Sequence, residues 1–230
     1  LENRKSETIS LVRALNVNVL DVLTIKINKF SSAYLFNKNS LDCILELIQK
    51  LKINLLIIDF QLSPIQQRNL ELLFKVKVID RTQVILEIFS SRAISNEGKI
   101  QVELAALNFQ KTRLVRSWTH LERQRGGSGF LGGPGERQIE LDRRIINKNI
   151  KNLNASLQKV VKTRSIQNSK RKNSSSIIAS LVGYTNTGKS TLFNNLTNSS
   201  VISKNMLFAT LDPTLRLMKH EMSYKNKIIL

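Results

Sequence analysis

The stretch "SIIASLVGYTNTGKSTLFNNLTN", residues 176–198, decides the fold expected for the carboxyl-terminal part of the chain. Its first seven residues form an apolar run typical of a buried strand, and its last eight predict a helix. Between them, "GYTNTGKS" (183–190) has the spacing Gly-x-x-x-x-Gly-Lys-Ser of a phosphate-binding loop. Because such a loop needs a strand before it and a helix after it, the order of these segments indicates a P-loop domain.

The residue types in this P-loop suit the binding of a phosphate chain. Loop amides and the positive end of the following helix supply donors that converge on phosphate. We expect Gly183 and Gly188 to let the backbone turn tightly, Lys189 to reach the β- and γ-phosphates, and Ser190 to offer its hydroxyl to Mg²⁺. An accidental glycine-rich turn with a surface lysine is the alternative, and the flanking strand and helix disfavour it.

The charge of the chain points to a polyanionic partner. Its 230 residues include 36 Lys and Arg against 17 Asp and Glu, a net charge of +19. Residues 111–172 alone hold sixteen of the cations and four of the acids. A merely solvated surface would spread this charge evenly, so we predict a dedicated contact with nucleic acid or the ribosome, and less readily with an anionic membrane.

Two apolar series at helical spacing surround a glycine-rich loop. Ile100, Leu107 and Leu114 belong to the first series, and Ile146 and Ile150 to the second. The loop between them, "RGGSGFLGGPGERQIE" (125–140), carries six of the nine glycines. This pattern predicts a basic helical hairpin whose glycine-rich tip approaches another surface closely. A flexible linker is the alternative that composition alone favours.

The first hundred residues alternate helix-like and strand-like segments, which predicts an α/β layer with parallel strands. Ser63 followed by Pro64 is a strong helix start. Asp59 and Asp80 stand at strand ends, where turn and capping roles are commoner than catalysis. The expected strands lie in 17–27, 54–60 and 75–80, and the expected helices in 6–16, 40–51 and 63–74.

These patterns predict three domains within an α/β fold class. They are an amino-terminal α/β domain (1–97), a basic helical hairpin with a glycine-rich tip and linker (98–172), and the first part of a P-loop domain (173–230). The polar segment "SIQNSKRKNSSS" (165–176) marks the last boundary.

The single cysteine, Cys43, lies in an apolar helical pattern, which favours a small core residue and a reducing compartment. No apolar run approaches the length that crosses a bilayer. We therefore expect a cytoplasmic protein without stable membrane insertion.

The P-loop and the later "LFATLDPT" (207–214) together resemble the start of the GTPase domain of HflX-type proteins, ribosome-associated GTPases of the P-loop, translation-factor-related class. Three upstream segments resemble the same family. They are "LSPIQQRNLE" (62–71), "VIDRTQVILEIFSSRAISNEGKIQVELAAL" (78–107) and "GGPGERQIELDRR" (132–144). The resemblance covers nearly the whole chain.

This resemblance implies GTP or GDP with Mg²⁺ as the ligands. It makes Thr210 the switch threonine that joins Ser190 on Mg²⁺ in the triphosphate state, and it matches Asn186 to an asparagine linked to potassium in related GTPases. The expected nucleotide-binding residues are Gly183, Asn186, Thr187, Gly188, Lys189, Ser190 and Thr191.

The resemblance also implies binding to ribosomal RNA of the large ribosomal subunit, with splitting or rescue of stalled ribosomes under stress. The glycine-rich tip would reach towards the RNA. The expected RNA-contacting residues are Arg123, Arg125, Arg137, Arg143 and Arg144.

Two motifs of the family, Asp-x-x-Gly and Asn-Lys-x-Asp, do not occur before Leu230. We therefore expect an incomplete GTPase and assign no catalytic residue. The alternatives are a non-catalytic RNA- or ribosome-binding remnant and an ATP-using P-loop enzyme, which the "LFATLDPT" match disfavours.

Overall fold

A computed structural model describes residues 2–27, 30–124, 134–173, 177–201, 207–208, 211–212, 214–218 and 228–229. The chain divides into two compact units, one made of 1–87 and 105–149 and the other of 88–104 and 150–230. It combines an amino-terminal α/β domain, a helical middle region and a carboxyl-terminal strand, loop and helix, which confirms the predicted α/β fold class.

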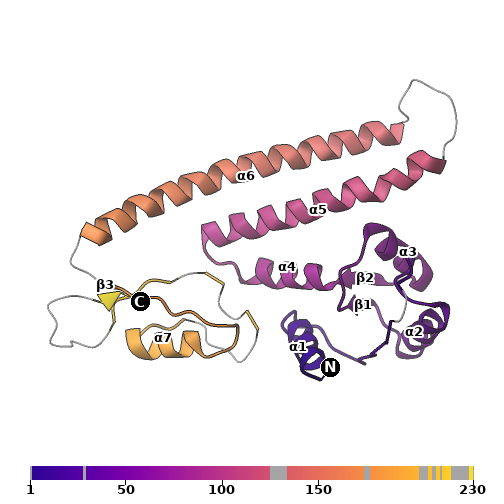
Figure 1. Ribbon diagram of the computed structural model, residues 1–230, viewed down its shortest axis with the longest axis horizontal. Coiled ribbons are helices and arrows are strands. Elements are labelled where there is room, and N and C mark those ends of the chain that lie inside the picture. The colour runs from indigo at the N-terminus through magenta and orange to yellow at the C-terminus, as the bar shows by residue number, and fades with distance from the viewer. Residues whose placement is uncertain are drawn as a thin grey trace. The chain divides into compact units, whose positions relative to one another are not determined.

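A parallel pair of strands lies at the centre of the α/β domain (Figure 1). Strand β1 (Leu55–Ile58) runs beside β2 (Lys77–Asp80) with Ile58 opposite Asp80, and helix α3 (Pro64–Phe74) connects them. Helices α1 (Glu2–Arg13) and α2 (Lys38–Leu51) complete the layer. The predicted parallel α/β arrangement is therefore correct. Its core consists of Leu35, Phe36, Ile44, Ile48, Ile58, Leu62, Leu70, Phe74 and Val78.

Helix α3 begins where its sequence predicts. The Ser63 hydroxyl accepts a hydrogen bond from the Gln66 amide at 3.2 Å, and the Gln66 side chain accepts one from the Ser63 amide at 3.0 Å. This capping box satisfies two donors that the helix leaves unpaired, and a cap of this kind contributes about 1 kcal/mol. Pro64 loses nothing at the first helical position.

The strand predicted in 17–27 is not present. This segment is extended, and Ile25 and Ile27 pack against the core, but its backbone joins no ladder. The Asp21 carboxylate accepts a hydrogen bond from the next amide, that of Val22, at 2.7 Å. Such a local bond gives the backbone an alternative to strand pairing. The segment instead borders an apolar cavity of about 880 Å³ together with α1, α2 and β1.

The prediction that Cys43 is a core residue is also wrong, because its side chain is exposed. On α2 the buried positions are Ile44 and Ile48. Cys43 precedes Ile44 by one residue, which is about 100° around the helix, so it lies off the apolar face.

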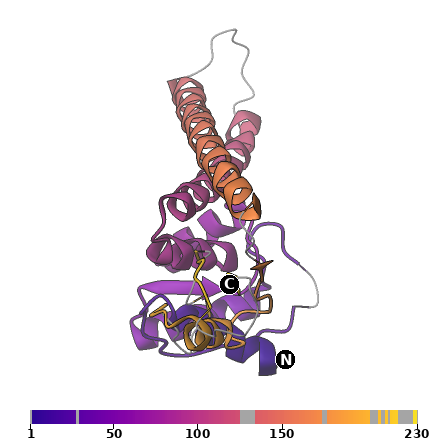
Figure 2. The same cartoon turned by 90° about the vertical axis from the view of Figure 1, so that its left-hand side faces the viewer.

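Three helices make up the middle of the chain, α4 (Arg81–Arg92), α5 (Asn96–Gln124) and α6 (Pro134–Asn173). The ribbons of α5 and α6 are uninterrupted over the described residues (Figures 1 and 2). The polar residues 165–173, expected to be linker, continue α6 as helix. They contain no Gly or Pro, and Lys, Arg and Gln are good helix formers. Arg164 of α6 forms an ion pair with Glu97 of α5 at 2.7 Å.

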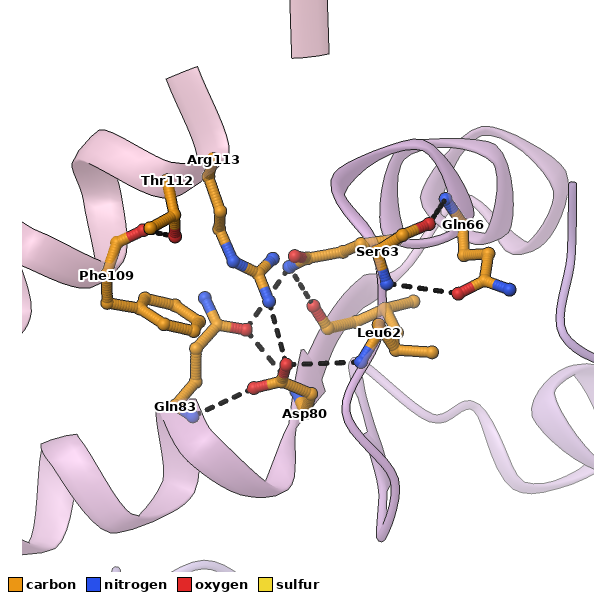
Figure 3. Close-up of polar contacts among 10 residues, drawn as sticks. Leu62, Ser63, Gln66, Asp80, Gln83, Phe109, Thr112 and Arg113 are labelled. Carbon is orange, nitrogen blue, oxygen red and sulfur yellow. Dashed lines mark hydrogen bonds and ion pairs between the residues drawn. The ribbon is translucent and has the colours of Figure 1, made fainter. Parts of the chain in front are cut away.

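A buried ion pair joins α5 to the end of β2 within the first unit (Figure 3). Asp80 is fully buried, and one of its oxygens, Oδ2, accepts hydrogen bonds from Arg113 Nη2 at 2.8 Å and from the Leu62 amide at 3.3 Å. Its other oxygen, Oδ1, caps α4 by accepting from the Gln83 amide at 2.9 Å. The Arg113 guanidinium also lies 4.3 Å from the centre of the Phe109 ring. Burial lowers the pKa of Arg113, and the charge of Asp80 opposes that change.

A second cluster of charges lies at the end of β1. Asp59 accepts hydrogen bonds from Arg81 at 2.8 Å and from Arg4 at 3.0 Å, and Arg81 also pairs with Glu7 at 2.8 Å. Burial alone would raise the pKa of Asp59, but the hydrogen bonds from Arg81 and Arg4 bring it below the ordinary value of 3.8. Asp80 therefore has the expected capping role, and both Asp59 and Asp80 also form ion pairs.

We expect the contribution of Asp59 to stability to depend on pH. Because its pKa is lower in the folded state, its contribution is complete above the unfolded value and is lost as pH falls through the folded value. The stability gap between the wild type and Asp59→Asn should be constant above about pH 5 and shrink below about pH 4. Urea unfolding at a series of pH values measures this gap. A gap that widens on acidification would contradict the assignment.

None of the helices in the described part of the chain combines the length and apolar character needed to cross a bilayer.

Candidate functional site

The P-loop lies between a short strand and a helix. Strand β3 (Ile177–Ile178) pairs in parallel with β4 (Ile228–Ile229), and helix α7 (Lys189–Thr197) follows the loop. The Ala179 amide adds a hydrogen bond to the Ile229 carbonyl at 2.9 Å. The predicted order of strand, loop and helix is thus present, although the paired strand is shorter than the expected run from 176 to 182.

Two residues of the loop have left-handed backbone conformations. Gly188 has a φ of 82° and Asn186 a φ of 60°. A side chain at position 188 would strain the backbone although the space around it is open. The role of Gly183 differs from the one expected, since a Cβ there would lie 3.2 Å from Thr187 Oγ1. Gly183 therefore permits close packing within the loop, and the sharp turn comes from Asn186 and Gly188.

The first turn of α7 presents backbone amides towards the loop. The first helical hydrogen bond runs from the Leu192 amide to the Gly188 carbonyl at 2.9 Å, so the amides of 189–191 come before it. Phe193 and Thr197 are buried and hold the helix in place. The result is a helix N-terminus with positive partial charge at the end of a glycine-containing loop.

Lys189 lies across the loop, and its ammonium group donates a hydrogen bond to the Tyr184 carbonyl. The Thr187 hydroxyl donates to the same carbonyl at 2.8 Å. A loop with two left-handed residues, a helix N-terminus and a lysine folded over it fits a phosphate chain chemically. The roles of individual loop residues as nucleotide ligands stay predictions.

The structure describes one of the two residues predicted to bind Mg²⁺. Ser190 is in the first turn of α7, where its hydroxyl fits the expected role, and Thr210 lies outside the described residues. Among the described residues, no group of three or more His, Cys, Asp or Glu could hold a metal ion. Ser190 and Thr210 therefore remain predicted metal ligands.

The predicted RNA-contacting arginines fall into three groups. Arg143 and Arg144 are exposed on α6, and Arg144 pairs with Glu140 one turn away. Arg123 and Arg137 belong to α5 and α6, but their side chains are outside the described part. Arg125 lies outside the described residues altogether.

Sequence reasoning missed a cluster in the second unit around Asp212. The carboxylate of Asp212 accepts hydrogen bonds from the amides of Ile94 and Ser95 at 2.9 and 2.8 Å. Burial alone would raise the pKa of Asp212, but these bonds and one from the Ser95 hydroxyl lower it. The partners are 117 and 118 positions apart in the chain, so no local pattern could have indicated the contact.

Three family models match consecutive parts of the chain. Residues 2–90 match the N-terminal region of a GTP-binding GTPase, and residues 92–171 match its middle region. Residues 178–229 match a model described as a 50S ribosome-binding GTPase.

Relatives and solved structures agree with these matches. The GTPase HflX of Magnetococcus marinus is 49% identical over 208 residues and that of Escherichia coli 47% over 207 residues. Each alignment covers 90% of this chain and 48% of the relative, so the chain spans about half the length of these relatives. A structure of SsGBP with GDP aligns over 99% of this chain and 58% of its own with 27% identity and a TM-score of 0.53. A GTP-binding protein of Sulfolobus solfataricus in complex with GDP, 24% identical over 99% of this chain and 56% of its own with a TM-score of 0.51, shares the fold.

Proposed function

The chain belongs to the HflX family of GTPases, and from this membership we propose that its P-loop binds guanine nucleotide with Mg²⁺ and that its basic middle region binds the large ribosomal subunit. For the whole protein we propose splitting or rescue of ribosomes under stress. This chain spans about half the length of the relatives that it matches.

The observation that carries the nucleotide proposal is the shape of the P-loop. Left-handed Asn186 and Gly188 bring the loop to the first turn of α7, and Lys189 lies over it. Amides at a helix N-terminus and a nearby ammonium group bind the phosphates of any nucleotide. The preference for guanine rests on the family, and the similar structure of SsGBP was solved as a complex with GDP.

Competition between nucleotides tests this preference. A fluorescent GDP analogue is bound to the chain with Mg²⁺, and unlabelled GDP, GTP and ATP are titrated against it. We expect GDP and GTP to displace the analogue at lower concentrations than ATP. Displacement by ATP at the lower concentration would instead support an ATP-using P-loop enzyme.

The charge of α6 supports the proposed contact with ribosomal RNA. From 143 to 173 this helix contains no Asp or Glu. Contacts between Lys or Arg side chains and phosphate position a protein on RNA, and they make the affinity for RNA depend steeply on salt. The exposed cations of its described side chains include Arg143, Arg144, Lys148, Lys151, Lys159 and Lys162.

We expect the variant R143Q/R144Q to weaken co-sedimentation with large subunits and to reduce its salt dependence. Each lost phosphate contact lowers the slope of log K against log salt by roughly 0.7 to 0.9. The double variant should therefore lower the slope by about 1.5. The variant K38Q/K50Q removes the same charge from exposed positions of α2 and serves as the control. Equal losses in both variants would indicate diffuse attraction, and no loss in either would contradict the α6 contact.

A non-catalytic RNA-binding remnant is the second candidate function, and the charge of α6 alone supports it. The two candidates differ in their response to nucleotide. A nucleotide-binding family member should co-sediment with large subunits differently in GTP, in GDP and without nucleotide, whereas a remnant should bind equally in all three.

A further inference from the structure

The described residues of the stretch 207–212, which are 207–208 and 211–212, include three that contact the end of α4 and the start of α5 in the second unit. Arg92, the last residue of α4, donates from Nη1 to the carbonyls of Leu207 at 3.2 Å and Phe208 at 2.9 Å. The rings of Phe208 and Phe89 meet edge to face with their centres 5.0 Å apart. One end of the stretch is therefore fixed by a cation and an aromatic pair.

The other end of the stretch caps α5. One oxygen of Asp212, Oδ2, accepts from the amides of Ile94 and Ser95, and the other, Oδ1, accepts from the Ser95 hydroxyl. That hydroxyl in turn accepts from the Gly98 amide at 2.9 Å, as an N-cap side chain does. A carboxylate from a distant part of the chain thus sits at the positive end of a 29-residue helix.

Gly98 makes room for this carboxylate. The position is buried, and a Cβ built on it would lie 2.3 Å from Asp212 Oδ1. Among the described glycines, only Gly188 has a positive φ. The backbone conformation at position 98 therefore does not require glycine. The need for glycine is steric, so any side chain at position 98 must displace Asp212.

We propose that Asp212 is a positioning residue that ties the stretch 207–212 to the first turn of α5, so that a change in this stretch changes the cap of the helix. The coupling to nucleotide rests on the proposed function. By that function Thr210, two residues before Asp212 in the sequence, belongs to the nucleotide switch. When GTP replaces GDP and the switch moves, Asp212 either keeps its hydrogen bonds to the start of α5, so that the helix end moves with it, or loses them.

Hydrogen exchange of the full 230-residue chain tests both parts. Without nucleotide, we expect Asp212→Ala and Gly98→Ala each to raise exchange in the peptide 93–104 about tenfold, because the hydrogen bonds from Asp212 to the start of α5 are lost. Lys99→Ala alters an exposed residue of the same turn and should leave exchange unchanged. Exchange at the wild-type level in Asp212→Ala would overturn the cap.

The second part compares Mg²⁺–GDP with Mg²⁺–GTPγS, and the peptide 183–193 reports binding at the P-loop. We expect exchange at 93–104 to differ between the two nucleotides in the wild type and to be alike in Asp212→Ala, with 183–193 protected in both proteins. A purely structural cap would not respond to nucleotide. Protection at 183–193 without any difference at 93–104 overturns the coupling alone. If neither nucleotide protects 183–193, the proposed function fails and the coupling fails with it, while the nucleotide-free comparison still decides the cap.

Discussion

Replacing Arg113 with alanine is expected to lower the free energy of unfolding by about 3 to 5 kcal/mol, as happens when one partner of a buried ion pair is removed. Asp80 is fully buried, and Arg113 is the cation that contacts it at 2.8 Å. Alanine would leave the carboxylate with amide donors only and no opposite charge. Urea unfolding followed by circular dichroism measures the loss as a shift of the midpoint.

An exposed ion pair provides the control for this experiment. Arg144 pairs with Glu140 along α6, and both side chains are more than half exposed. Such pairs contribute at most about 1 kcal/mol, so Arg144→Ala should change stability little. The variant Asp80→Asn combined with Arg113→Ala should be less damaging than the sum of the single changes, because it leaves no buried charge. If Arg113→Ala and Arg144→Ala had equally small effects on the free energy of unfolding, leaving Asp80 buried without an opposite charge would cost little, which contradicts the prediction.

Replacing Lys189 with alanine is expected to weaken GDP binding by at least about 30-fold. The ammonium group is the cation of the P-loop, and losing a close charged contact to phosphate costs about 2 kcal/mol or more. Titration with a fluorescent GDP analogue in the presence of Mg²⁺ gives the affinity.

Two further variants make the Lys189 result specific. Lys170→Ala removes an exposed charge from α6 and should leave nucleotide affinity unchanged. Lys189→Arg keeps the charge but not the compact ammonium group, so its affinity should fall between those of the alanine variant and the wild type. Full affinity in Lys189→Ala would mean that nucleotide binds elsewhere or that the loop does not contact phosphate through this side chain.

Local chemistry in the sequence predicted much of the fold. Ser63 and Pro64 begin a helix for reasons contained within four residues, and that helix is present with its capping box. The segment 17–27 shows where this reasoning ends. Its apolar residues fit a strand. The segment nevertheless pairs with no other strand, and the Asp21 carboxylate accepts a hydrogen bond from the Val22 amide.

The candidate site was predictable only where it is contiguous. The loop from 183 to 190 carries its own spacing, and Gly188 was expected at a tight turn. Asn186 could have been recognised too, because asparagine adopts the left-handed conformation more readily than most residues. By contrast, the contacts of Asp80 with Arg113 and of Asp212 with Ser95 join residues far apart in sequence, and a single sequence contains no signal that pairs them.

The ion pair between Asp80 and Arg113 has a consequence for the order in which the chain folds during translation. A nascent chain leaves the ribosome from its amino terminus, so Asp80 emerges 33 residues before the cation that neutralises it. Until α5 has been synthesised past position 113, closing the α/β domain would enclose a lone carboxylate. The amino-terminal domain predicted to end at 97 therefore reaches its final stability only after part of the middle region has been made.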